Sequence, residues 1–158
     1  MKALVVFYSR TGTTRKVANL IKSILKCDSE EIHDITSRKG IVGYILGGRD
    51  ALFKLFTSIK NVKKNPSDYD LVIIGTPIWS FTLTPAIRSY INGHKSSFKK
   101  VAFFCTEGDS GGQNAFKEME KLSKLKPIAT LELKEDRIKK EKYENHVKKF
   151  VQTLISYS

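Results

Sequence analysis

Cysteine and proline are scarce in this sequence, and long apolar runs are absent. Its 2 cysteines, Cys27 and Cys105, stand far apart without metal-ligand spacing, so we predict no metal site and treat both as small buried residues in a reducing compartment. No apolar run approaches the roughly 20 residues of a membrane span. The chain also begins directly with a strand-like run instead of a signal-peptide pattern. We therefore expect a cytoplasmic protein without a membrane span.

Acidic residues are also in short supply. Lysine and arginine number 28 against 16 aspartates and glutamates, which leaves a formal net charge of +12. Such a surplus predicts attraction to something acidic, which could be a protein, a nucleic acid or a membrane surface. The lysines of the C-terminal half are scattered and do not alternate with aromatic residues. We interpret most of them as solvated helix faces and do not favour nucleic acid as a partner.

Apolar runs typical of buried strands alternate with amphipathic stretches typical of helices. The predicted strands cover residues 3–7, 30–35, 71–75, 101–105 and 128–133. The predicted helices cover residues 17–25, part of 40–59, 85–91, 115–122 and 143–155. Without repeats or linkers, this alternation predicts one α/β domain over residues 1–158, with a parallel sheet covered by helices on both faces. Loops after the first, third and fourth strands should meet at the ligand-binding carboxyl ends of the sheet.

The first of these loops, Ser9-Arg10-Thr11-Gly12-Thr13-Thr14, carries 4 hydroxyl side chains and a glycine directly after a buried strand. A strand-to-helix junction of this kind aims backbone N–H groups and the positive end of a helix dipole at one spot, which suits a phosphate. Helix capping by Thr13 or Thr14 is the alternative, but capping needs only one such residue. The pattern therefore favours an anion site.

The second loop, 76–82, contains Trp79 among proline and hydroxyl residues. These neighbours argue against a buried strand, so we expect a stacking tryptophan in place of a core or interface one. The first loop lacks the Gly-x-Gly-x-x-Gly spacing of a pyrophosphate site, which disfavours NAD or FAD. One phosphate site plus one aromatic loop suits a mononucleotide with a large flat ring.

The run Val5-Val6-Phe7-Tyr8-Ser9, followed by Gly12, Thr14 and Ala18, resembles the N-terminal signature of the flavodoxin family. Gly75-Thr76-Pro77-Ile78-Trp79 is similar to the second loop of a flavodoxin-like branch. The resemblance implies a doubly wound, single-domain fold with five parallel strands in the order 2-1-3-4-5 and non-covalent FMN between three loops. The implied FMN contacts are Ser9, Arg10, Thr11, Gly12, Thr13 and Thr14 at the phosphate, Thr76, Pro77, Ile78, Trp79, Ser80 and Phe81 at the ring, and Thr106, Glu107, Gly108, Asp109 and Gly112 at the pyrimidine edge.

The chain departs from familiar flavodoxins in its basic charge and in a third loop, 106–112, without an aromatic residue. We expect an electron-transfer protein that passes electrons between redox partners through its flavin, with no acid–base catalytic residues. One alternative is an NAD(P)H-dependent FMN or quinone reductase, because the missing aromatic leaves room for a hydride donor. Another is a flavin-free basic binding module.

Excess positive charge implies an acidic redox partner, such as a ferredoxin-type donor or acceptor. We expect it to dock near the second and third loops, where Arg88 and Lys117 follow. In the third loop, Glu107 and Asp109 should either lower the second reduction potential of the flavin or point to water and act weakly.

Overall fold

A five-stranded parallel sheet forms the centre of the protein, whose computed structural model describes residues 1–35 and 40–157. Its strands are β1 (Ala3–Phe7), β2 (Asp28–Glu31), β3 (Leu71–Trp79), β5 (Val101–Glu107) and β6 (Pro127–Lys134). They are ordered β2-β1-β3-β5-β6, and the two-residue strand β4 (Thr82–Leu83) pairs antiparallel with the end of β3. Apart from β4, this is the predicted order 2-1-3-4-5, so the predicted fold class is confirmed.

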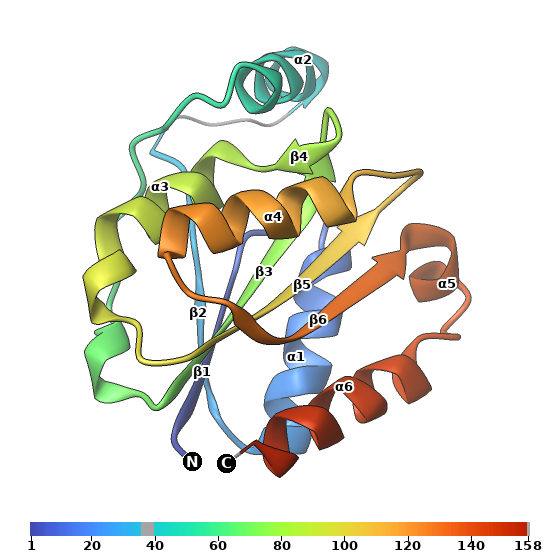
Figure 1. The fold of residues 1–158 in the computed structure, drawn as a ribbon. Coiled ribbons are helices and arrows are strands. Elements are labelled where there is room, and N and C mark those ends of the chain that lie inside the picture. The colour runs from blue at the N-terminus through green and yellow to red at the C-terminus, as the bar shows by residue number, and fades with distance from the viewer. Residues whose placement is uncertain (36–39, 158) are drawn as a thin grey trace.

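Helices cover both faces of the sheet (Figure 1). α1 (Thr13–Leu25) and α6 (Glu144–Ser156) pack on one face, and α3 (Pro85–His94) and α4 (Gly112–Ser123) pack on the other. α2 (Gly40–Leu52) lies beyond the end of β3, against β4 and α3, and the short α5 (Glu135–Lys139) follows β6. In the described ranges, no helix combines the length and apolar character needed to cross a bilayer.

Strand side chains alternate between two apolar clusters, which explains the continuous apolar runs of the sequence. From β1, Leu4 and Val6 join the cluster beneath α3 and α4, whereas Val5 and Phe7 join the cluster beneath α1 and α6. β1 therefore has no polar face, as expected for an inner strand of a doubly wound sheet.

The second strand lies earlier in the chain than predicted. β2 covers Asp28–Glu31, because β1 ends at Phe7 and its last partner is Glu31. Ile32 is buried in the core and still donates its N–H to the Phe7 carbonyl at 2.8 Å, after which the chain leaves the sheet. The next residues bond a later segment, as in the bond from the Ile35 N–H to the Ser58 carbonyl. The apolar residues of 32–35 therefore reflect the last contact with β1 and this second contact, and not a longer strand.

Two predicted loops begin as strand. β3 continues through Trp79 because Thr76 and Pro77 still pair with β5, and β5 continues to Glu107 because it pairs with β6. At the tip of the β3–β4 hairpin, Ser80 and Phe81 adopt left-handed backbone conformations with φ values of 48° and 62°. Pro77 and the hydroxyl residues predicted an earlier end, yet strand pairing outweighs these local preferences.

Candidate functional site

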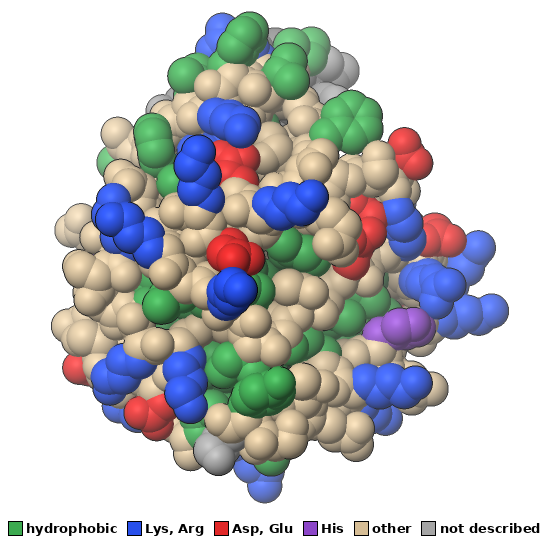
Figure 2. Space-filling model, viewed as in Figure 1, with side chains coloured by type: hydrophobic (Ala, Val, Ile, Leu, Met, Phe, Trp, Pro, Cys, Tyr) green, Lys and Arg blue, Asp and Glu red, His purple; other side chains and the backbone are tan. Residues whose placement is uncertain are grey.

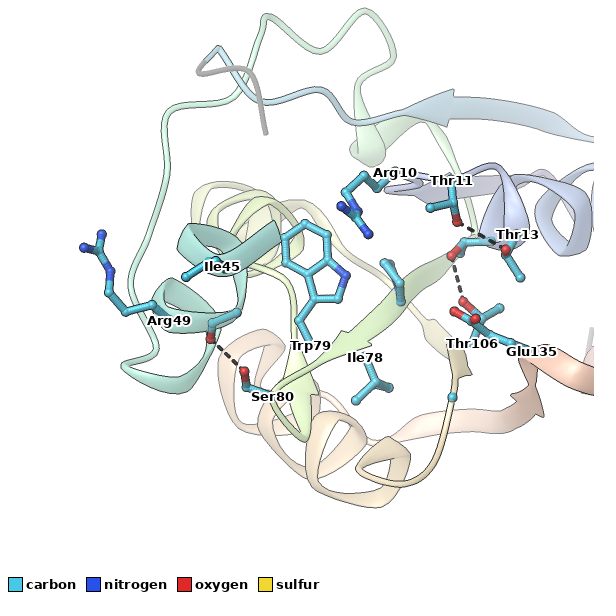
Figure 3. A pocket seen from close by; sticks show the side chains of 14 residues that line it. Arg10, Thr11, Thr13, Ile45, Arg49, Ile78, Trp79, Ser80, Thr106 and Glu135 are labelled. Atoms are coloured by element: carbon cyan, nitrogen blue, oxygen red, sulfur yellow. Dashed lines mark hydrogen bonds between the residues drawn. The ribbon is translucent and has the colours of Figure 1, made fainter. Parts of the chain in front are cut away.

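A cavity of about 430 Å³ opens where the carboxyl ends of β1, β3 and β5 meet (Figure 3). Its volume falls in the range of small-molecule sites. The predicted residues that line it are Arg10, Thr11, Thr13, Thr14, Pro77, Ile78, Trp79, Ser80, Thr106 and Gly108. The structure thus brings members of all three predicted loops to one cavity, and their contacts with a cofactor stay a prediction.

The first loop turns into α1 at Gly12, whose φ of 94° is left-handed and suits a residue without a side chain. Gly12 is also the N-cap, and its position carries no side-chain cap, so the alternative of capping by Thr13 or Thr14 is wrong. Instead, the Ser9 hydroxyl accepts the N–H groups of Gly12 and Arg15, each at 3.2 Å. The loop is therefore held from within, while the first turn of α1 faces the cavity.

Three threonine hydroxyls border this helix terminus. Thr11 and Thr13 lie with their hydroxyl oxygens 3.3 Å apart. Thr14 is buried, and its hydroxyl lies 2.8 Å from the hydroxyl of Thr106 on β5. Thr14 therefore joins the first loop to the third, which leaves Thr11 and Thr13 as the more accessible hydroxyl donors.

Trp79 forms the aromatic wall of the cavity. Tyr8 packs against its ring edge-on, with ring centroids 5.5 Å apart and planes at 87°. The Arg10 guanidinium carbon lies 5.9 Å from the centroid of the Trp79 ring. In the view of Figure 3, the indole stands between Arg10 and Ile45. Trp79 lies at the end of a strand but is only partly buried, so a purely core role does not describe it.

Several predicted site residues lie outside the lining. Thr76 is fully buried and donates its hydroxyl to the Pro77 carbonyl, and Gly112 is buried at the start of α4. Phe81 is 59% exposed and borders a separate groove. Ser9 and Gly12 shape the first loop, as described above. For Ser9, Gly12, Thr76 and Gly112, the structure supports a role in positioning the loops.

Glu107 lies beneath the third loop and anchors it. Its carboxylate accepts the Gly112 N–H at 2.9 Å and the Lys134 ammonium at 2.5 Å, and Lys134 also donates to the Asp109 carbonyl. Burial alone would raise the pKa of Glu107, but the hydrogen bonds from Lys134 and its neighbours hold that pKa below its ordinary value. A buried charge paired in this way fixes the loop, whereas the Asp109 side chain is exposed to water.

Glu132 neighbours Glu107 and gives a pH-dependent prediction. Partial desolvation of its carboxyl group raises the pKa of Glu132 above 4.5, and the nearby Glu107 raises it further. A raised pKa in the folded state stabilises the protein below pH 4.5, and this contribution is lost as pH rises through the folded pKa. We expect Glu132→Gln to raise the free energy of unfolding at pH 7.5 by at most about 0.5 kcal/mol, because the side chain is exposed and screened.

Urea unfolding at pH 7.5 and at pH 4 measures this effect. The gain should be smaller at pH 4, because the raised pKa of Glu132 favours its protonated form in the folded protein as pH falls. An equal gain at both pH values would contradict the charge interaction between the two carboxyl groups.

Four cavity residues were not predicted. Ile45, Gly48 and Arg49 come from α2, and Glu135 starts α5. The Ser80 hydroxyl donates to the Gly48 carbonyl at 2.8 Å, which ties α2 to the β3–β4 hairpin (Figure 3). Glu135 follows the last strand and could have been found by the strand-end rule. No local pattern places α2 beside the cavity, since its position depends on tertiary contacts.

An open parallel sheet with a polar cleft at its strand ends and an aromatic wall defines a nucleotide-type binding fold. A family model described as flavodoxin matches residues 51–154. The chain belongs to the flavodoxin family.

Solved structures share the fold. A flavoprotein from Lactobacillus acidophilus, solved in complex with FMN, is 24% identical, with 88% of this chain and 97% of that chain covered and a TM-score of 0.71. Flavodoxin 2 from Bacillus cereus is 17% identical over 100% of both chains, with a TM-score of 0.63. Rubredoxin oxygen:oxidoreductase from Desulfovibrio gigas is 16% identical over 98% of this chain and 36% of that chain, with a TM-score of 0.55. No curated protein matches by sequence.

Proposed function

We propose that the protein binds FMN non-covalently in this cavity and serves as an electron carrier. The observation that carries the proposal is the pairing of the α1 N-terminus with Trp79 across one cavity. The helix terminus and the threonine hydroxyls suit a phosphate, and the indole suits a flat conjugated ring. FMN supplies the redox chemistry when bound, while the protein supplies binding, orientation and electrostatics.

The phosphate assignment predicts that Thr13→Val and Thr11→Val each weaken FMN binding. Each variant removes a hydroxyl donor to a charged group, which is worth about 1.5–3 kcal/mol, or roughly tenfold or more in affinity. Fluorescence titration of the apoprotein with FMN measures the change. Thr14→Val is a poor test, because it also leaves the buried Thr106 hydroxyl without its Thr14 partner.

Thr153→Val is the matched control. Thr153 lies on α6, where its hydroxyl donates to the Lys149 carbonyl, far along the chain from the cavity residues. This variant should bind FMN like the wild type. Unchanged affinity in both loop variants would refute the phosphate assignment.

Stacking predicts a large change in flavin fluorescence in Trp79→Ala. Bound FMN should be strongly quenched in the wild type and should recover most of its emission in the variant, measured at saturating FMN. Tyr8 contacts the indole but is absent from the cavity lining, so Tyr8→Phe should leave the quenching in place. Equal quenching in wild type and Trp79→Ala would mean that another residue stacks on the ring.

A reductase is the second candidate, and the cavity wall favours it. Trp79 is the one aromatic residue among the described residues that line the cavity. A flavin that stacks on Trp79 alone would leave its other face open to a hydride donor such as NAD(P)H. Anaerobic mixing of the FMN-loaded protein with NADH or NADPH separates the two functions, because rapid bleaching supports a reductase and unchanged absorbance supports a carrier.

For the carrier, the proposed partner is an acidic redox protein, because the chain carries a net charge of +12. Lys117 is exposed and suits the docking role predicted for it. Arg88 does not, since its side chain is only 1% exposed and bonds to Glu118. Its docking role is therefore wrong, because it is a buried structural residue.

A further inference from the structure

An exposed apolar surface lies beside the cavity. It consists of Leu52, Phe53, Leu55 and Phe56, which end and follow α2, together with Phe81 at the hairpin tip. Exposed fractions run from 45% at Leu55 to 67% at Phe53. Figure 2 shows hydrophobic side chains gathered over α2, with Lys and Arg side chains close beneath them. Clustering of this kind on a monomer marks an interaction site more often than chance exposure.

The backbone beneath this surface is firmly held. The Arg88 guanidinium donates to the Leu55 carbonyl at 3.2 Å. The Ser89 hydroxyl donates to the Thr57 carbonyl at 2.7 Å and lies 2.9 Å from the Thr57 nitrogen. Because the main chain is fixed from the α3 side, the leucine and phenylalanine side chains are presented outward in a defined arrangement.

A groove with three lysines adjoins these apolar residues. Leu52 and Phe81 line it with Lys54, Lys117 and Lys121. Its one acidic lining residue, Glu118, bonds the buried Arg88 at 2.9 Å and Thr82 at 2.8 Å and lies 3.9 Å from the exposed Lys54 ammonium, so one carboxylate faces Arg88 and three lysines. The groove therefore keeps a positive charge that an acidic partner would complement.

The groove adjoins the cavity, because Ser80 lines both. We propose that this surface, formed by the five apolar residues and the three groove lysines, is the docking site for an acidic redox protein. The proposal rests on the proposed electron-carrier function. A partner seated here lies next to the cavity, with apolar contact at the centre of the interface and lysines around it. A second copy of this chain suits it less, since both copies would carry +12.

The test uses the FMN-loaded full chain and an acidic ferredoxin as the probe. Stopped-flow absorbance gives the second-order rate constant of electron transfer. We expect Leu52→Ser/Phe81→Ser to lower it at least tenfold. The matched control Ile155→Ser/Tyr157→Ser changes two side chains of similar exposure, 54% and 59%, at the C-terminal end. It should stay within twofold of the wild type.

Charge is tested with two sets that each remove three lysines. Replacing Lys54, Lys117 and Lys121 with Gln should lower the rate constant of electron transfer at least tenfold at low salt. It should also make this rate constant less dependent on salt. Replacing Lys142, Lys148 and Lys149 with Gln should change the rate constant less than twofold. Equal slowing by both sets would overturn the docking site, because net charge alone would then explain the rates.

Two further measurements separate the causes of failure. FMN affinity and reduction by dithionite are measured in every variant, so loss of the cofactor is distinguished from loss of docking. A wild type that binds no FMN, or accepts no electrons from the ferredoxin, overturns the carrier function and the docking site together. The wild type is also tested for dimer formation and for binding to anionic vesicles. If Leu52→Ser/Phe81→Ser abolishes either one, the surface binds a second copy or a membrane, and the redox-protein proposal is overturned.

Discussion

Replacing Arg88 with Ala should lower the free energy of unfolding by about 3–5 kcal/mol, the cost of breaking a buried ion pair from one side. The Arg88 side chain is 1% exposed and that of Glu118 is 13% exposed. The guanidinium also donates to the Leu55 and Leu83 carbonyls. The variant leaves Glu118 charged and mostly buried, with the Thr82 hydroxyl at 2.8 Å and the exposed Lys54 ammonium at 3.9 Å as its remaining partners.

Urea unfolding followed by circular dichroism measures this loss. Lys95→Ala is the control, because Lys95 is exposed at the end of α3 and should change stability by no more than about 0.5 kcal/mol. The double variant Arg88→Met/Glu118→Leu should lose less than the sum of the two single variants, since it removes both charges. A loss below about 1 kcal/mol in Arg88→Ala would contradict the buried-pair account, since it falls in the range of an exposed ion pair.

Gly111→Ala should cost about 3 kcal/mol and should also weaken FMN binding. Gly111 has a φ of 120°, which strains any residue with a side chain, and an added Cβ would lie 2.6 Å from the Phe81 Cα. Strain of this kind costs about 1–3 kcal/mol, and overpacking adds a similar amount. Phe81 belongs to the hairpin that carries Trp79. Relief of the clash would therefore move Trp79 away from the third loop.

Gly93→Ala is the matched control for this variant. Gly93 lies in α3, and an added Cβ would meet nothing within 4 Å. Alanine there should stabilise the protein by about 0.5–1 kcal/mol, because it restricts the unfolded chain and favours the helix. Thermal unfolding and FMN titration of both variants give the result. Normal FMN affinity in Gly111→Ala would show that the hairpin and the third loop are not coupled.

The local sequence pattern correctly predicted the elements that depend on interactions between residues close in the chain. The apolar run at 3–7 is β1 to the residue, since a strand buried on both faces needs apolar side chains throughout. Residues 9–14 were likewise predicted to join this strand to a helix, and the structure places the junction there, although α1 already begins at Thr13. Trp79 was predicted to stack on a flat ring; the structure places it in the cavity lining, and the stacking itself stays a prediction.

Tertiary structure decided what depends on residues distant in the chain. From the sequence, Arg88 was predicted to be a surface charge. In the structure its guanidinium donates to Glu118 on α4 and to the Leu55 carbonyl in the segment after α2. Glu107 was predicted to be a loop carboxylate, but in the structure it accepts a hydrogen bond from Lys134 on β6. Some features depend only on interactions between residues close in the chain: the alternation of strands and helices, the turn glycines and the hydroxyl-rich loops. The sequence by itself therefore determined the fold class and the place of the cavity. Burial and pairing of charges arise only when separate elements pack, so only the folded chain decided which charges are buried and paired and which stay exposed.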